Sequence, residues 1–403
     1  MKRKTKKITF FTSESVTEGH PDKVCDQIAD AILDAIIKKD PEESRVACEV
    51  AITKELIHVM GEISTKASLD IAKIAKGVVC SVGYTHSVTG FDGNNCSVIL
   101  SVNPQSEDIA IGVNHSFEER LGFKGSFNKL GASDQGTVFG FACNESPNLM
   151  PLPIFFANRL AFYIDNCRKN KKIDYLMPDG KAQVTVEYEN SLPKRVETIA
   201  ISVQHMEGVP IDQIREDITK HVILPAINRK FLNSETQILI NPTGRFVIGG
   251  PLGDTGLTGR KIMVDTYGGY SKHGGGSLSG KDPTKVDRSG SYVARYIAKN
   301  IVAAKIAEKC EVQISYVIGL ANPISFTINA FGTSRYSNRK ILNAVKKIFD
   351  VRPYAIIKQL DLRKPIYRNL AKYGQIGRQS LGVKWERTNK IKSLLNAINN
   401  FKN

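Results

Sequence analysis

Residues 249–288 read GGPLGDTGLTGRKIMVDTYGGYSKHGGGSLSGKDPTKVDR, and eleven of these forty residues are glycine. Glycine lets backbone approach a ligand closely and adopt positive φ angles without strain. The run also carries cations and carboxylates, which are Arg260, Lys261, Lys281, Lys285, Arg288, Asp254, Asp265, Asp282 and Asp287. Bare backbone, cations and carboxylates together favour a site for a polyphosphate with its metal ions. A flexible linker is the alternative.

The embedded apolar residues argue against the linker. Linkers are rich in Gly and Ser without apolar patterning, whereas Ile262, Met263 and Val264 form a short apolar stretch that predicts a buried strand. Residues 275–281 also fit the P-loop spacing G-x-x-x-x-G-K, but Asp282 follows where a P-loop needs Ser or Thr. No β-branched strand leads into Gly275 either, so we expect a phosphate-binding loop that is not a P-loop.

Composition indicates an ordinary globular chain of several domains. It has 403 residues, of which 41% are hydrophobic and 24% charged. No apolar run approaches the ~20 residues of a membrane helix, and the start is too polar for a signal peptide. The seven cysteines form no C-x-x-C pair, which favours reduced thiols in the cytoplasm over a zinc site or a disulfide framework.

The net charge of +16 lies at the two ends of the chain. Residues 335–403 hold 17 Lys and Arg against three acidic residues, and residues 2–7 add five more cations, so the part between them is slightly acidic. The basic residues at 339, 340, 346 and 347 flank apolar residues at helical spacing. This pattern is typical of a solvated helix face, and without an aromatic RNA-binding motif we do not expect nucleic acid as a partner.

Apolar periodicity predicts a mixture of helices and strands. Pro21 to Lys39 has proline in its first turn, Asp22 beside it and apolar residues on one face, which predicts a helix. Between 103 and 133 the pattern fades, and such a long segment is usually functional or disordered. The other predicted helices cover 69–80, 154–170, 212–229, 292–309 and the basic region near 339–348. Strands are predicted at 46–53 and 56–65, which a tight polar turn should join into a hairpin. The other predicted strands cover 96–100, 182–188, 196–204, 236–240, 311–320 and 324–331.

These elements favour an α+β fold over a doubly wound parallel sheet, because many strands neighbour one another along the chain. The segment FTSESVTEGHPDKVCDQIADA (11–31) then places His20 and Asp22 at the start of the first helix, where the helix dipole favours phosphate. It occurs in order with RVACE, SDQG, GRFVIGGP, GLTGRK, VDTYGG, HGGG and KVDRS. With this set, the chain resembles the S-adenosylmethionine synthetase (methionine adenosyltransferase) family from about residue 10 to about residue 386.

The resemblance implies that the sulfur of methionine attacks C5′ of ATP and that the departing triphosphate is then hydrolysed to pyrophosphate and phosphate. A thioether needs no general base, whereas charge building on the triphosphate needs cations and metal. The family implies two Mg²⁺ and one K⁺ per site, and a homodimer or a homotetramer (a dimer of dimers) with sites between subunits. It also implies three similar domains in a pseudo-threefold arrangement. We divide the chain into an N-terminal domain at 8–105, a mobile active-site loop at 106–133, a central domain at 134–247 and a C-terminal domain at 248–390.

Motif matching also implies a role for individual residues. The residues that would act on the triphosphate during catalysis are His20, Lys181, Arg260 and Lys281. The further ATP-binding residues would be Asp179, Arg245, Phe246, Asp254, Lys261 and Ser277. The methionine-binding residues would be Glu62, Gln105, Asp134, Asp254 and Lys285. Asp22 and Asp287 match the ligands of Mg²⁺, and Glu49 matches the ligand of K⁺.

Two other functions stay open at this stage. The near-P-loop spacing would suit an ATP phosphotransferase, which would release ADP. The basic C-terminal region would suit a nucleic-acid binder.

Overall fold

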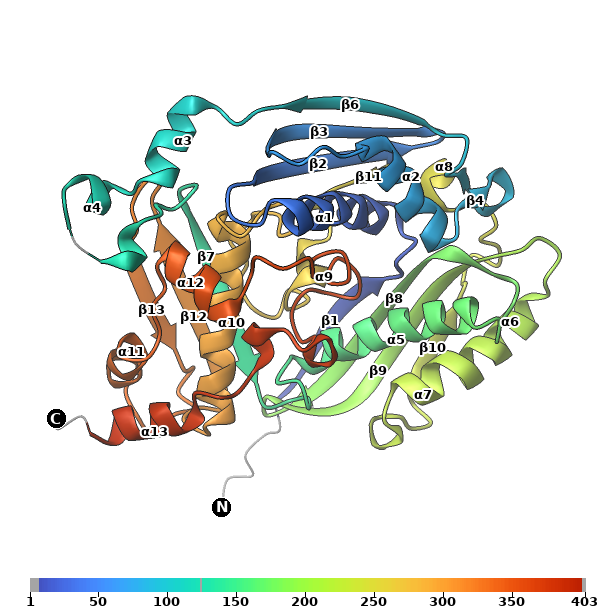
Figure 1. Ribbon diagram of the computed structural model, residues 1–403. Coiled ribbons are helices and arrows are strands. Elements are labelled where there is room, and N and C mark those ends of the chain that lie inside the picture. Colours follow the sequence, from blue (N-terminus) through green and yellow to red (C-terminus); the bar gives the residue numbers. More distant parts are fainter. Residues whose placement is uncertain (1–6, 124, 401–403) are drawn as a thin grey trace, which may run out of the picture.

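Three sheets of three or four strands, each packed against helices, form most of the computed structural model of the chain (Figure 1), and two short strands form a further sheet. The structure describes residues 7–123 and 125–400. The mixture of antiparallel strand pairs and interspersed helices confirms the predicted α+β class.

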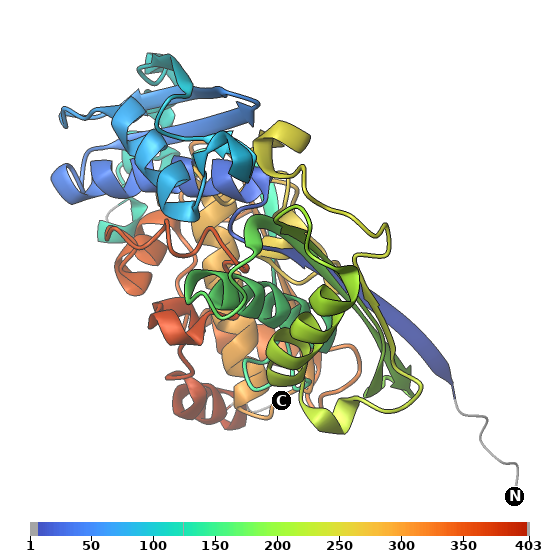
Figure 2. The same ribbon diagram turned by 90° about the vertical axis from the view of Figure 1, so that its right-hand side faces the viewer.

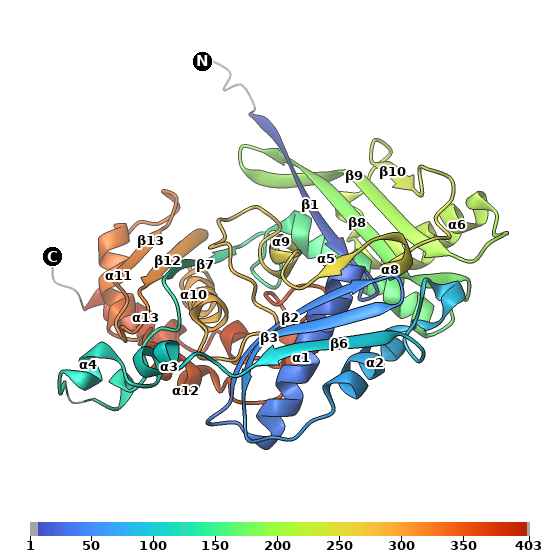
Figure 3. The same cartoon turned by 90° about the horizontal axis from the view of Figure 1, so that it is seen from above.

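The first sheet has the strand order β11-β2-β3-β6. Its hairpin β2-β3 is antiparallel and confirms the predicted hairpin, and β6 joins β3 in parallel. Figures 1 and 3 show α1 and α2 against one face of this sheet. The bounds are β2 Arg45–Thr53, β3 Leu56–Ser64, β6 Ser97–Asn103, β11 Gly256–Leu257, α1 Pro21–Lys39 and α2 Ile71–Val82.

The second sheet has the order β1-β8-β9-β10 and contains the two longest strands, β8 and β9. In Figure 2 the strands of this sheet lie on the right-hand side of the molecule, and α5 lies to their left. The bounds are β1 Ile8–Val16, β8 Leu176–Glu189, β9 Leu192–His205, β10 Gln237–Ile240, α5 Leu152–Lys169, α6 Ile211–Ile218 and α7 Leu224–Ala226.

The third sheet has the order β13-β12-β7, and α10 packs across β7 and β12. The ring of Tyr292 on α10 stacks on Trp385 at a centroid distance of 4.0 Å. The bounds are β7 Gly136–Cys143, β12 Lys309–Tyr316, β13 Ser325–Asn329, α10 Val286–Ala303, α11 Asn338–Lys346, α12 Pro353–Leu360 and α13 Ile391–Asn399. Short elements outside the three sheets are β4 Thr85–His86, β5 Phe91–Asp92, α3 Glu107–Asn114, α4 Phe117–Arg120, α8 Gly250–Gly253 and α9 Ile262–Asp265.

Each sheet takes strands from distant parts of the chain. β1, at the start of the chain, pairs with β8 and places Val16 opposite Lys181. β7 pairs with β12 in the third sheet, and β11 of the glycine-rich run pairs with β2 of the first sheet. These exchanges cross the four ranges into which the sequence was divided, and those ranges stay a prediction.

Helix α1 has the predicted bounds, and it begins at Pro21 as the sequence predicted. Pro21 occupies the first turn, and the His20 ring accepts a hydrogen bond from the Asp22 N–H, which caps the helix. Val24, Ile28 and Ile32 are fully buried on its apolar face.

Four predictions from the pattern were wrong in detail. The helix predicted at 292–309 is α10, which begins six residues earlier, at Val286, and ends at Ala303. Residues 262–264 form one helical turn, α9, in place of a strand, and Asp265 at its end pairs with Lys23 of α1. The segment 103–133 contains α3 and α4 in place of continuous loop. The helix predicted at 212–229 widens into a π-turn at Thr219–Ile223 and ends at Ala226. Pro225 lacks the N–H that a regular helix needs there.

Close approach of β7 to α10 yields a test of the packing. A Cβ on Gly140 would lie far inside contact distance of the Ala294 backbone carbonyl. We expect Gly140→Ala to lower the free energy of unfolding by about 2–3 kcal/mol through overpacking. The matched control is Gly77→Ala in α2, where a Cβ would meet nothing within 4 Å. Removing a helical glycine should there raise stability by about 0.5–1 kcal/mol. Thermal unfolding of both variants measures the difference, and equal melting temperatures would contradict the packing argument.

Candidate active site

The His20 side chain sits at the start of α1 as a neutral, buried imidazole. Its Nδ1 accepts the Asp22 N–H at 3.2 Å, so the ring proton belongs on Nε2. Burial first, and then the nearby charge of Lys261, lowers the pKa of His20 to about 3. The Nε2 atom is buried and has no hydrogen-bond partner among the residues that the structure describes. A buried donor without a partner is costly, which points to an acceptor on a ligand.

Asp22 gathers the cations of the glycine-rich run around the His20 ring. Its Oδ1 accepts the Leu257 N–H at 3.0 Å and its Oδ2 accepts Lys261 Nζ at 2.9 Å. Arg260 Nε lies 3.6 Å from Oδ1. Burial alone would raise the pKa of Asp22, but the Leu257 N–H and the Lys261 ammonium outweigh it and hold the pKa below its usual value. The residue is therefore an ionised carboxylate. Lys181, across the β1-β8 pairing, adds a further positive charge near His20.

Four aspartates at four-residue spacing on α1, which we call the acidic ladder, hold the C-terminal half of the chain. The ladder is Asp22, Asp26, Asp30 and Asp34. Residues four apart lie on one face of a helix. Their carboxylates accept the backbone N–H groups of Leu257, Gly259, Gly280, Tyr367 and Arg368 at 2.8–3.0 Å.

Buried ion pairs complete the ladder. Asp30 also pairs with Arg288, and both side chains are fully buried. Lys23 bridges Asp26 and Asp265. Removing one partner of such a pair typically costs about 3–5 kcal/mol. The positions of Arg260, Lys261 and Lys281 therefore follow from α1.

A second group of predicted residues lines a cavity of about 280 Å³ between the first sheet and the start of α10. Lys281 Nζ contacts Asp287 Oδ2 at 2.6 Å, and Lys285 Nζ contacts the buried Asp282 at 2.5 Å. The lining residues are Arg45, Ala47, Glu62, Gln105, Ser106, Ser133, Asp134, Lys281, Lys285 and Asp287. We call His20, Asp22, Lys181, Arg260 and Lys261 the His20 group, and the lining of this cavity the Asp287 group. Within the described residues the two groups share no member, so a single chain presents them separately.

Glycine is required where the HGGG segment passes Asp287. A Cβ on Gly276 would overlap the Asp287 carboxylate, and a Cβ on Gly274 would overlap the Thr137 carbonyl. His273, which opens the segment, accepts the Gly275 N–H on Nδ1 at 2.8 Å, and its Nε2 is buried without a partner in the described chain. The backbone here runs in direct contact with the carboxylate.

The predicted nucleoside contacts cluster where β8, β9 and the 245–254 turn meet. Asp179 Oδ2 accepts the Gly250 N–H at 2.9 Å, and its buried Oδ1 has no partner among the described residues. Burial raises the pKa of Asp179 to about 6. The backbone of Phe246 exchanges hydrogen bonds with His205, and its ring lies over Gly249.

Other predicted residues lie at the margins. Asp254 is exposed and forms the C-terminal cap of α8. Arg245 pairs with the exposed Glu207 at 2.6 Å, so the structure does not bring it to the His20 group. The Ser277 hydroxyl donates to the Ser279 carbonyl. Glu49 lies on β2, and Lys281 is near enough to lower its pKa, although burial and neighbouring acids raise that pKa overall.

Three site features were missed by the sequence reasoning. Arg45, which lies in the RVACE motif, lines the second cavity and donates to Asn114 at 2.7 Å. Ser133 lies in the SDQG motif and also lines the second cavity, and His273 has a buried Nε2 without a partner among the described residues. The signal that could have identified these three residues is that each lies within a matched motif. The acidic ladder was readable as aspartate at every fourth position of α1.

No three His, Cys, Asp or Glu side chains converge as a metal cluster in the described chain. The carboxylates of Asp22, Asp287 and Glu49 are instead available one at a time. A single carboxylate with phosphate and water oxygens suits Mg²⁺, which retains much of its hydration. The residues present therefore fit metal ions that arrive with a polyphosphate.

Three family models cover the chain. The N-terminal domain of S-adenosylmethionine synthetase matches residues 8–107, the central domain matches 129–246, and the C-terminal domain matches 248–387. An S-adenosylmethionine synthase of Clostridium botulinum (strain Alaska E43 / Type E3) is 55% identical over 385 residues, which are 96% of this chain and 98% of that protein. Among the described helices, none is long and apolar enough to span a membrane. The chain belongs to the S-adenosylmethionine synthetase family.

Proposed function

We propose that this chain joins methionine to ATP by a direct displacement at C5′. The lone pair of the methionine sulfur forms the new S–C bond, and the C5′–O bond breaks with its electrons passing to the triphosphate. The triphosphate is then hydrolysed to pyrophosphate and phosphate. The observation that carries this proposal is the neutral His20 ring with its unpartnered Nε2 beside Asp22, Lys261 and Arg260.

The chemistry asks for charge stabilisation and not for a base. Negative charge grows on the departing oxygen, so His20 Nε2–H would donate to an oxygen of the triphosphate near C5′. Because its pKa is about 3, His20 stays a neutral donor at physiological pH. Lys181, Arg260, Lys261 and Lys281 would bind the phosphate oxygens, and metal ions bound there would neutralise further charge.

Separate residues would recognise the two substrates. Phe246 would stack on adenine, and the unpartnered Oδ1 of Asp179 would accept a hydrogen bond from the nucleoside. Ser277 would complete ATP binding. Glu62, Asp134 and Asp254 would hold the methionine ammonium. Gln105 and Lys285 would hold the methionine carboxylate.

Two Mg²⁺ and one K⁺ per site would accompany the substrates. Asp22 and Asp287 would each contribute one carboxylate to Mg²⁺, and Glu49 would contribute to the K⁺ site. Omitting either cation from the assay should lower turnover, and unchanged turnover without K⁺ would remove Glu49 from this role.

We also propose that the protein works as a homodimer, or as a homotetramer built from dimers, with each site between two chains. Two observations support this. One chain presents the His20 group and the Asp287 group separately. Large apolar side chains are exposed on strands of the first two sheets, namely Phe10, Ile99, Leu100 and Ile238.

We place the enzyme in the cytoplasm. All seven cysteines lie in the described chain as free thiols, which suits a reducing compartment. Cell fractionation tests this placement, and recovery from a membrane or secreted fraction would contradict it.

A product assay tests the reaction directly. Incubation with ATP, methionine, Mg²⁺ and K⁺ should yield the sulfonium product, pyrophosphate and phosphate in equal amounts. Oxygen-18 water should label the products of triphosphate hydrolysis and leave the sulfonium product unlabelled. The control omits methionine. Appearance of ADP without the sulfonium product would instead show an ATP phosphotransferase.

A heterodimer tests the shared site. His20→Asn and Asp287→Asn should each lower turnover by about a hundredfold or more, because each removes a group that stabilises the transition state. The His20→Asn chain and the Asp287→Asn chain carry different affinity tags, are co-expressed and are purified over both tags. If each site takes His20 from one chain and Asp287 from the other, the mixed dimer has one site with both defects and one intact site. We expect about half of the wild-type turnover.

The control is Asp212→Asn, which changes a 90% exposed side chain in a surface ion pair and should leave turnover unchanged. An inactive mixed dimer would place both residues in one chain's own site. Failure of the two tagged chains to co-purify would contradict the dimer.

The segment 106–133 would close the site as a mobile loop. Gln105 and Ser106 at its start and Ser133 and Asp134 at its end line the second cavity. The segment is docked through Glu118, whose carboxylate accepts the N–H groups of Ala321 and Asn322 at 2.8 and 2.9 Å. A loop attached at both ends to substrate contacts is well placed to exclude water after closing.

Limited trypsin digestion tests this loop. Arg120 and Lys129 are exposed, and Lys124 lies outside the described residues. Cleavage in this segment should be fast in the free enzyme and slow with methionine and a non-hydrolysable ATP analogue. Glu118→Ala should speed cleavage, whereas Glu107→Ala, an exposed neighbour without such contacts, should not. Equal cleavage with and without ligands, or full activity after excision of residues 114–128, would contradict a closing loop.

A further inference from the structure

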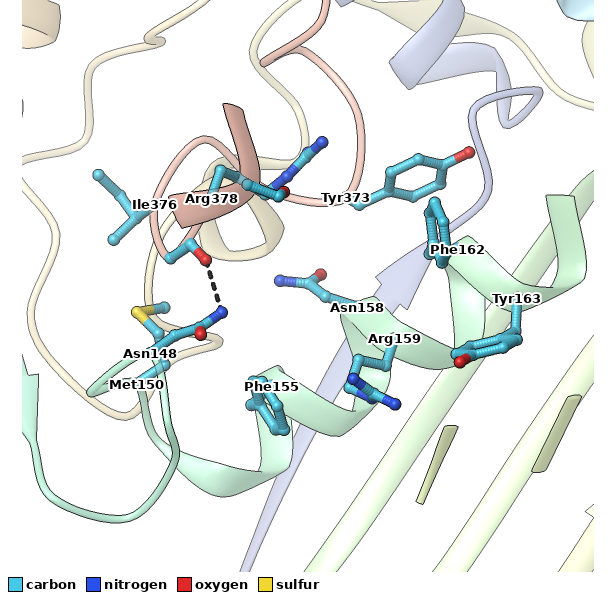
Figure 4. Close-up of a pocket in the computed structure, with 12 residues that line it drawn as sticks. Asn148, Met150, Phe155, Asn158, Arg159, Phe162, Tyr163, Tyr373, Ile376 and Arg378 are labelled. Atoms are coloured by element: carbon cyan, nitrogen blue, oxygen red, sulfur yellow. Dashed lines mark hydrogen bonds between the residues drawn. The ribbon is translucent and has the colours of Figure 1, made fainter. Parts of the chain in front are cut away.

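A cavity of about 220 Å³ lies between α5 and the turn formed by residues 373–380 (Figure 4). Its lining shares no residue with the His20 group or with the cavity of the Asp287 group, as far as the structure describes the chain. The lining residues are Asn148, Met150, Phe155, Asn158, Arg159, Phe162, Tyr163, Tyr373, Ile376, Gly377, Arg378 and Ser380.

Aromatic rings form much of this wall. Phe162 contacts Tyr373 edge to face, with ring centroids 5.7 Å apart. Phe155 and Tyr163 line the same cavity from α5, the helix that carries Phe162. Phe162 is 48% exposed, so part of its ring is available to a ligand. Rings arranged in this way favour a flat aromatic guest, because aromatic pairs gain about 0.5–1.5 kcal/mol beyond their buried area.

The charged groups of the wall are all positive. Arg159 donates from Nε and Nη2 to the carbonyls of Ala226 and Pro225, which fixes its side chain against the rings of Phe155 and Tyr163. Arg378 donates from Nη1 to the carbonyls of Lys372 and Gly374. Each guanidinium keeps N–H groups without a partner in the described chain, and no acidic side chain lines the cavity. An anion is the complementary guest.

One neutral donor also points into the cavity. Asn158 Oδ1 accepts the Ser15 hydroxyl at 2.7 Å, which leaves its amide nitrogen free of hydrogen bonds within the described residues. Figure 4 shows this amide projecting from α5 into the space below the 373–380 turn.

We propose that this cavity binds a small flat aromatic anion, such as an aromatic carboxylate, sulfonate or phosphate. The rings supply the surface for the flat part, Arg159 and Arg378 supply the positive charge, and the Asn158 amide supplies a directional donor. The cavity volume of about 220 Å³ suits a compound of two or three aromatic rings.

Two hydrogen bonds join the cavity wall to the segment that carries His20. The Tyr373 hydroxyl donates to Asp165 Oδ2 at 2.8 Å, and the same oxygen accepts the Glu18 N–H at 2.8 Å. Glu18 stands two residues before His20. A guest that fixes Tyr373 and Asn158 therefore also restrains residues 15–20, and binding in the cavity is coupled to the order of that segment.

Fluorescence titration with anilinonaphthalene sulfonate tests the binding site on the full-length enzyme. The probe should bind saturably at one site per chain, and saturating methionine with a non-hydrolysable ATP analogue should not displace it. Phenylnaphthylamine, which has the same rings without the sulfonate, should bind about tenfold more weakly. Equal affinity for the neutral compound, or displacement by the substrates, would overturn the assignment.

Matched variants locate the probe. Phe162→Ala removes an aromatic wall and should weaken binding about fivefold, which corresponds to about 1 kcal/mol. Arg159→Gln should weaken binding of the anion and leave the neutral compound unaffected. The control is Phe331→Ala, because Phe331 is 47% exposed and lies outside the cavity. Wild-type affinity in both cavity variants would overturn the proposal.

Hydrogen exchange tests the coupling separately from activity. Bound probe should slow amide exchange in residues 13–24 at least about twofold. Tyr373→Phe keeps the ring and removes the hydroxyl that donates to Asp165, so this variant should bind the probe and lose the slowing. Unchanged exchange in the wild-type enzyme, or slowing that persists in Tyr373→Phe, would overturn the coupling.

Discussion

The acidic ladder of α1 joins the N-terminal helix to the segments that follow residue 256. Each aspartate satisfies backbone N–H groups that a loop would otherwise leave unpaired in the interior. Neither side is stable alone, because a buried carboxylate and a buried N–H both need a partner. Since a helix rises 1.5 Å per residue, the rungs lie about 6 Å apart, and the glycine-rich run must follow the helix at that spacing. Arg260 and Lys261, two cations of the run, are thereby placed beside His20 and Asp22.

The same constraint gives the glycines a second purpose. A Cβ on Gly256 would overlap the Pro21 carbonyl, and one on Gly280, whose φ is +77°, would overlap the Cys48 carbonyl. These two residues are glycine because the run lies directly on α1 and β2. Gly276, in contrast, is glycine because it passes the Asp287 carboxylate. The composition of the run suggested that its glycines approach a phosphate, but Gly256 and Gly280 are required by packing against protein.

Local sequence patterns predicted most of the helices and strands. They did not predict which distant strands pair with one another. The bounds of α1 were predicted correctly because Pro21 and His20 define its start within a few residues. The β2-β3 hairpin was predicted because two apolar stretches are joined there by a tight polar turn. No local pattern could show that β1 joins β8 or that β11 joins β2, because these pairings connect residues more than 150 positions apart. Residues 262–264 look like a strand by composition, but their conformation follows from the contact of Asp265 with Lys23.

For the candidate site, motifs identified residues but not their grouping. The His20 group and the Asp287 group come from motifs that interleave along the chain, so sequence order carries no information on which of them meet. Nor could sequence show the charge states, because the neutral form of His20 depends on burial and on Lys261. Arg245 illustrates the converse, since a residue inside a matched motif lies at the surface beside Glu207.

The residues before His20 are each fixed by a different element. The Thr17 hydroxyl donates to Pro178 at the start of β8, the Glu18 N–H donates to Asp165 of α5, and the Gly19 carbonyl accepts from Tyr84, beyond the end of α2. The position of the His20 ring therefore depends on how the first sheet sits against the second. A substitution or ligand that shifts α5 can reach His20 through Glu18 without touching it. This connection makes the helical side of the molecule part of the environment of the proposed active site.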